Sequence, residues 1–147
     1  MPLITTAKEA RDLVYDKLAA NKTALGLGYI GKDDERKLPR YPAVVVTAGP
    51  REKELHGTQT FAIVFRVFVW VYHAKLSIGH RQRSDEDLDL VSAVETLLEH
   101  DLSFNDSLIH GWVESDTPGV FQPRASKGDL VIGTRMVWMG LSEQRFQ

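Results

Sequence analysis

The sequence predicts an α+β fold in which an antiparallel or mixed β-sheet carries two α-helices packed on one face, with one long projecting strand or hairpin. Three observations predict this class. Two segments carry apolar residues at helical spacing behind a side chain that can cap a helix. Other segments alternate apolar and polar residues or are rich in β-branched residues, as strands are. One of these segments is much longer than an ordinary strand.

The composition predicts one folded domain over residues 1–147, with 43% apolar residues and a formal net charge of -2. Such a charge lacks the basic excess that drives nonspecific phosphate binding, so nucleic acid is not the expected partner. The chain has no cysteine, which excludes disulfides, thiolate metal ligands and cysteine nucleophiles. Neither a secretory leader nor an apolar run of roughly 20 residues is found, so we expect no export and no membrane span.

Two segments have the signals of an amphipathic helix. Thr6 and Glu9 have the spacing of a capping box, so the first helix is predicted to start there and to run to Ala20. Ser84 precedes acidic residues that favour a helix start, and the second helix is predicted to end at His100. The apolar stripes are Ala7, Ala10, Val14 and Leu18, and Leu90, Val91, Val94, Leu97 and Leu98. Each stripe predicts a helix that packs on a sheet.

The β-branched run Ala43–Thr47 predicts the first clear strand, because it lies between Pro42 and a Gly-Pro pair. A short strand around Leu27–Ile30 is a further candidate. The charged stretch Gly49–Gly57 is predicted to be a turn region.

The segment Thr58–Lys75 alternates apolar side chains on both faces and predicts one unusually long strand. At about 3.3 Å per residue it would span roughly 60 Å, so either a bulge bends it or part of it projects from the domain. Later strands are predicted over Leu108–Glu114 and Leu130–Leu141, with a long loop over Asp116–Gly128 between them.

Arg66 interrupts the apolar alternation of the long strand and shares its face with Phe68, Trp70 and Tyr72. Arginine and aromatic residues are enriched where proteins meet proteins, so this face is a candidate interface. In the alternative interpretation, the two predicted helices cover the same aromatic residues.

No residue pattern predicts catalysis, a metal site or a cofactor. The five histidines are not spaced as metal ligands. The acidic residues at the second helix start are explained by capping and by the helix dipole. No nucleophile motif is present, so we expect a protein that is not an enzyme.

The order of elements resembles the tail terminator, or tail completion, proteins of long-tailed bacteriophages. The resemblance rests on the opening helix Thr6–Ala20, the Pro-bounded strand at 41–46, the aromatic strand at 61–73, the polar connection into 87–91 and the last strand at 137–139. It implies a virion protein made in the bacterial host cytoplasm. It also implies a ring, typically of six subunits, that caps the tail tube and joins it to the head. The implied partners are further copies of the chain, the tail tube protein and a head-closure or neck protein.

For such a ring, exposure and charge select the candidate contacts. The candidate interface residues are Arg51, Glu52, Lys53, Glu54, Arg66, Arg81, Arg83, Arg124 and Lys127. DNA would pass through the channel without specific binding, so we expect Asp and Glu to dominate its lining. Head–tail adaptors and head-closure proteins remain alternatives within the same setting. A small α+β enzyme or ligand-binding domain, with a pocket near His73 or His110, is the alternative of another class.

Overall fold

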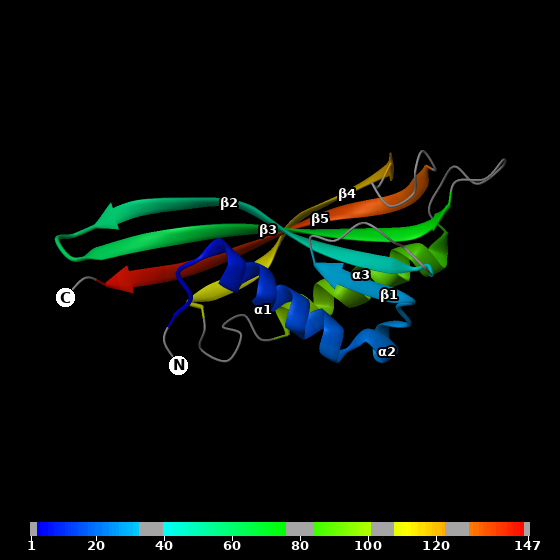
Figure 1. Ribbon diagram of the computed structural model, residues 1–147, viewed down its shortest axis with the longest axis horizontal. Helices are drawn as coiled ribbons and strands as arrows, with labels where there is room; N and C mark the ends of the chain where they lie inside the picture. The colour runs from blue at the N-terminus through cyan, green and yellow to red at the C-terminus, as the bar shows by residue number, and fades with distance from the viewer. Residues whose placement is uncertain (1–2, 33–39, 76–83, 101–107, 123–129, 146–147) are drawn as a thin grey trace.

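The computed structural model describes residues 3–32, 40–75, 84–100, 108–122 and 130–145 (Figure 1). In these ranges the chain forms a five-stranded mixed sheet and three helices, so the α+β prediction is confirmed. The elements follow one another as α1, α2, β1, β2, β3, α3, β4 and β5.

The two longer helices begin where their caps predict. Helix α1 spans Ala7–Ala20, and the Glu9 amide donates to the Thr6 hydroxyl at 3.2 Å. Helix α3 spans Asp85–Glu99, and the Asp87 amide donates to the Ser84 hydroxyl at 3.2 Å. Both capping boxes are complete, because each acidic side chain also accepts from the backbone of its cap residue. A single-turn helix, α2 at Lys22–Leu25, was not expected from the sequence.

The sheet has the strand order β1-β2-β3-β5-β4. The strands span Tyr29–Lys32 (β1), Ala43–His56 (β2), Thr60–Lys75 (β3), His110–Phe121 (β4) and Val131–Arg145 (β5). β1 lies parallel to β2, and every other neighbouring pair is antiparallel. The sequence therefore located all five strands, and its errors lie in their lengths.

Two predicted loops are wrong. The stretch Gly49–Gly57 was expected to be a turn, but β2 continues to His56 and the chain turns at Gly57, which has a φ of 71°. The first part of the predicted loop Asp116–Gly128 belongs to β4, which runs to Phe121; residues 123–129 lie outside the described residues. Both segments are polar, and they form strands because they pair with β3 and β5 over a long register.

Strands β2, β3 and β5 extend past the helices at one end of the molecule (Figure 1). We call this extension the arm; it comprises residues 51–56, 60–64 and 141–145. The register between β2 and β3 shifts between Ala48 and Arg51, which is a bulge where the arm begins.

Helices α1 and α3 lie on the same face of the sheet (Figure 1). Their buried residues form one core with alternate residues of β3 and with β2 and β5. The main members are Val14, Leu18, Val94, Leu98, Val44, Val46, Phe65, Val67, Val69, Met136 and Trp138. The interpretation in which the helices cover Phe68, Trp70 and Tyr72 is therefore wrong, since these residues alternate with the core positions.

A candidate interface on the aromatic face of the sheet

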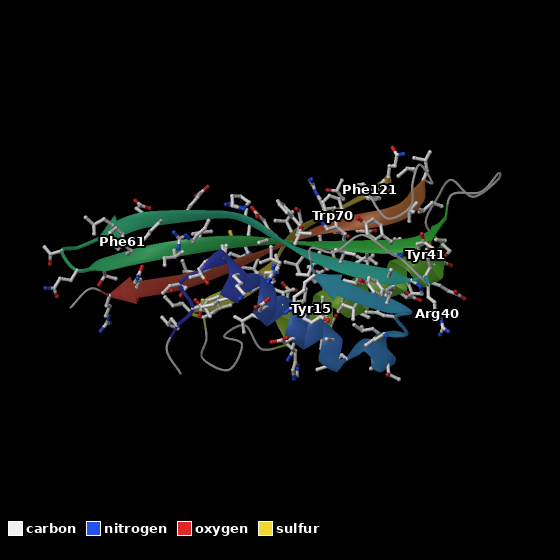
Figure 2. All side chains as sticks on the ribbon, viewed as in Figure 1. Tyr15, Arg40, Tyr41, Phe61, Trp70 and Phe121 are labelled. Carbon is white, nitrogen blue, oxygen red and sulfur yellow. The ribbon has the colours of Figure 1, made fainter. Side chains whose placement is uncertain are left out.

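The sheet face turned away from α1 and α3 is named here the aromatic face. Along β3 it carries Ala62, Val64, Arg66, Phe68, Trp70 and Tyr72. Figure 2 places Trp70 and Phe121 on the opposite side of the sheet from Tyr15 of α1. A second, smaller cluster of buried residues lies here, with Val45 and Tyr72 among its members.

The Phe121 ring contacts two other aromatic rings of this face edge to face. The Phe121 ring lies 5.4 Å from that of Trp70 and 6.5 Å from that of Tyr72, centroid to centroid. A Cβ at Gly133 would lie 3.0 Å from the Phe121 ring and 2.8 Å from the Val71 carbonyl, so only glycine leaves room for the ring. Edge-to-face contacts of this kind stabilise the arrangement of the three rings.

Arg66 has its charge partners within the chain. Its Nε lies 3.3 Å from Glu114 and its Nη1 lies 3.5 Å from Glu52, so two carboxylates from β4 and β2 flank one guanidinium. The side chain is 28% exposed. Arg66 therefore holds neighbouring strands together, and its reversal to glutamate would perturb the fold as well as any interface.

Arg135, which the sequence analysis did not single out, lies on the same face, and no described carboxylate pairs with it. Its guanidinium carbon is 5.8 Å from the Phe68 ring centroid and 5.9 Å from that of Trp70. Its Nε is buried without a hydrogen bond, and the described part of the chain brings no carboxylate within ion-pair distance. The signal that marked Arg66, a charge inside an apolar strand, also marks Arg135 within Leu130–Leu141.

The candidate contacts Arg51, Glu52, Lys53 and Glu54 lie on the β2 strand of the arm and are exposed. Arg51 donates to the Thr5 carbonyl at 2.7 Å, and the Lys53 ammonium lies 4.4 Å from the Phe61 ring centroid. Strand alternation places Glu52 and Glu54 on the aromatic face and the two basic residues on the helix face.

The remaining candidates Arg81, Arg83, Arg124 and Lys127 lie outside the described residues.

His73, one of the two histidines near which a pocket was considered, is buried between elements. Its Nε2 lies 3.0 Å from the Thr134 hydroxyl, and its Nδ1 lies 3.6 Å from the Asp87 carboxylate. The imidazole thus links β3, β5 and the first turn of α3. A hollow of about 540 Å³ lies between α2 and α3 and is lined by Leu25, Asp89 and Leu97 among others, but by neither His73 nor His110.

The carboxylates of Glu95, Glu99 and Asp116 lie near one another where α3 packs against β4. Burial raises the pKa of Glu95, and the nearby charges of Glu99 and Asp116 raise it further. Glu99 also accepts a hydrogen bond from the Val113 amide at 3.2 Å, next to the bulge of β4. Among the described residues, no group of three potential metal ligands is found.

No helix within the described ranges has the length and apolar content needed to cross a bilayer. Comparison of the sequence with models of known protein families gives no match. Comparison with curated proteins gives none either.

Proposed function

We propose that the chain is a structural subunit of a phage-type tail: a terminator that forms a hexameric ring, caps the tail tube and joins it to the neck. The observation that carries this proposal is the division of the sheet into two faces. One face is packed under the helices, while the other presents aromatic rings and two arginines and continues into the arm. Aromatic and arginine side chains together are typical of protein interfaces.

The arm also supports an assembly role. It combines a long antiparallel hairpin with exposed charged residues and with Leu55, which is 59% exposed near the tip. A projecting element of this kind is unusual in a protein that acts alone, because it adds surface without adding core. In the proposed ring the arm contacts a neighbouring subunit or the tube, as its residues Arg51, Glu52, Lys53 and Glu54 were expected to do.

The proposal is tested with tail tubes assembled from the tube protein of the same phage. Purified chain is added while tubes are growing, and tube length and tube ends are examined by negative-stain electron microscopy. We expect short tubes that each end in a ring with an open centre. Tubes that grow to the same length with and without the chain, and that carry no added density, would contradict the proposal.

The same preparation separates the alternatives. A head–tail adaptor or a head-closure protein would bind portal-bearing heads and leave tube growth unchanged. Mixing the chain with heads and with tubes in parallel, followed by sedimentation, identifies which of the two particles carries it down.

A further inference from the structure

The cross-strand register arranges the aromatic face in rows that can be followed along β3. The pairs are Trp70 with Arg135, Phe68 with Val137, Arg66 with Met139, Val64 with Leu141 and Ala62 with Glu143. Cross-strand partners share a face, so each pair lies side by side. Arg66 stands four residues from Trp70 in one direction and four residues from Ala62 in the other. Arg66 therefore lies midway between the Trp70–Arg135 row and the Ala62–Glu143 row.

The two halves of the aromatic face, one on each side of Arg66, complement one another in size and in charge. On one side of Arg66 lie the large rings of Phe68 and Trp70, with the guanidinium of Arg135 above them. On the other side, along the arm, lie the small side chains of Ala62 and Val64 together with carboxylates. The carboxylates of this face of the arm belong to Glu52, Glu54 and Glu143.

We infer that the aromatic face binds the aromatic face of a second copy of this chain, about a two-fold axis that crosses the strands at the row of Arg66 and Met139. This axis lies between the two sheets and runs across the strands, so the strands of the second copy run in the opposite direction. Each row therefore faces the row of the second copy that lies equally far from Arg66 on the other side. Arg135 then faces Glu143 of the second copy, and Trp70 faces Ala62 of the second copy. Phe68 faces Val64 in the same way.

The pairing supplies Arg135 with a carboxylate, which no described residue of its own chain places near it. Among the described residues the Glu143 carboxylate forms an ion pair only with Arg145, at 3.3 Å, and the Arg145 side chain is 80% exposed, so exchanging that partner costs little. A guanidinium that lies on aromatic rings and is shielded from water gains more from a carboxylate than an exposed one does.

The row at the axis and the rows farthest from it are also compatible with this pairing. At the axis Arg66 meets its own copy, but Glu52 and Glu114 already flank each guanidinium and offset the like charges. Six residues from Arg66, the Tyr72–Gly133 row meets the Thr60–Arg145 row. Arg145 of the second copy thereby reaches the Phe121 ring, which lies over Gly133 and can accept a cation.

A second copy is the occupant that these observations select, because the chain's own arm carries both the small side chains and the carboxylates that the other end of the face needs. The inference does not rest on the proposed ring, since it concerns the chain in solution. It requires only that the arm and the aromatic rows belong to one continuous face, as the register gives them.

Charge reversal tests the central contact. Arg135→Glu and Glu143→Arg are each expected to raise the dissociation constant of a two-chain species by about tenfold or more, measured by sedimentation equilibrium. The double variant Arg135→Glu with Glu143→Arg is expected to restore association, because the pair is re-formed with its charges exchanged. Lys8→Glu and Asp16→Arg, both exposed on α1, are the matched controls and should associate as the parent chain does.

A wild-type chain that stays a single copy at every concentration would overturn the inference, as would single reversals that associate as tightly as the α1 controls. Arg135 is partly buried on the aromatic rings, so Arg135→Glu could weaken association by disturbing their packing. The Glu143→Arg variant on the arm tests the ion pair without changing a residue that contacts those rings. Circular dichroism confirms that each variant is folded.

A second measurement locates the axis and is independent of charge. The chain has no cysteine, so Met139→Cys introduces a single thiol at the axis row, where a residue meets its own copy. A short bismaleimide should link two Met139→Cys chains much faster than two Ala20→Cys chains, whose thiol lies on α1. Equal rates would overturn the pairing. Rings on tail tubes combined with equal cross-linking rates in solution would overturn the pairing alone, whereas efficient cross-linking in solution without tube capping would overturn the proposed function alone.

Discussion

The two arginines of the aromatic face differ only in what surrounds them. Both interrupt apolar strands, and both lie on the side of the sheet away from the helices. Arg66 lies between carboxylates of β2 and β4, whereas Arg135 lies on the Phe68 and Trp70 rings and has a buried Nε to which no described residue is hydrogen-bonded. The first arginine is therefore tied to the fold, and the second is directed to a partner.

Replacing Arg66 should measure its contribution to the fold. Arg66→Met removes the cation and leaves Glu52 and Glu114 close to one another, so we expect the free energy of unfolding to fall by about 1 kcal/mol. Urea denaturation at neutral pH and one fixed protein concentration measures it. Lys8→Met, at an exposed position of α1, should change the free energy of unfolding very little. Equal changes in the two variants would show that the Arg66 ion pairs contribute nothing.

At the scale of the elements, the contact between α3 and β4 has two opposing effects. It satisfies a backbone amide of the edge strand β4, and it brings carboxylates of like charge close together. β4 is an edge strand, and the carboxylate of Glu99 accepts from the Val113 amide beside its bulge. The same contact crowds Glu95 with Glu99 and Asp116, which adds to the effect of burial on its pKa. Glu99 thus accepts a hydrogen bond from the edge strand, while the charges of Glu99 and Asp116 disfavour the ionised form of Glu95.

The pH dependence of Glu95 follows from its raised pKa. The folded chain binds this proton more tightly than the unfolded chain, so the residue lowers stability at neutral pH, and the cost disappears as pH falls through the folded pKa. Glu95→Gln should therefore stabilise the protein at pH 7, with a gain that shrinks towards acidic pH. Urea midpoints across this range measure the gain. Glu86→Gln, exposed in the first turn of α3, should give no gain; a Glu95→Gln variant no more stable than the parent at pH 7 would contradict the prediction.

At the scale of the whole molecule, one sheet serves two purposes. Its helix face supplies the core of the fold, and its aromatic face, extended by the arm, supplies the surface from which we infer association. Two copies bound as a pair would hide this face, so the pair and the proposed ring, which both use it, would form under different conditions. The near-neutral charge of the chain agrees with a ring through which DNA slides.

In the proposed ring, the channel should be lined mainly by Asp and Glu. A lining rich in Lys and Arg would bind phosphates through counterion release and slow the passage of DNA. Cryo-electron microscopy of rings on tube ends would identify the lining residues directly. A channel whose charged side chains are mostly Lys and Arg would contradict the prediction.

The sequence by itself determined the features that depend on near neighbours. The capping boxes at Thr6 and Ser84 form between residues three apart, and the alternation along β3 follows from the two-residue period of a strand. For this reason the helix starts, the existence of the strands and the α+β class were predicted correctly.

Only the tertiary structure decided which polar segments are strands and which charges are paired. The charged half of β2 and the polar half of β4 resemble loops along the chain, and they become strands because β3 and β5 provide long partners for hydrogen bonding. Likewise Glu114 reaches Arg66 across 48 residues of sequence, while no described carboxylate reaches Arg135. Such contacts depend on strand order and register, which local patterns do not encode, because they are set by the packing of the whole sheet.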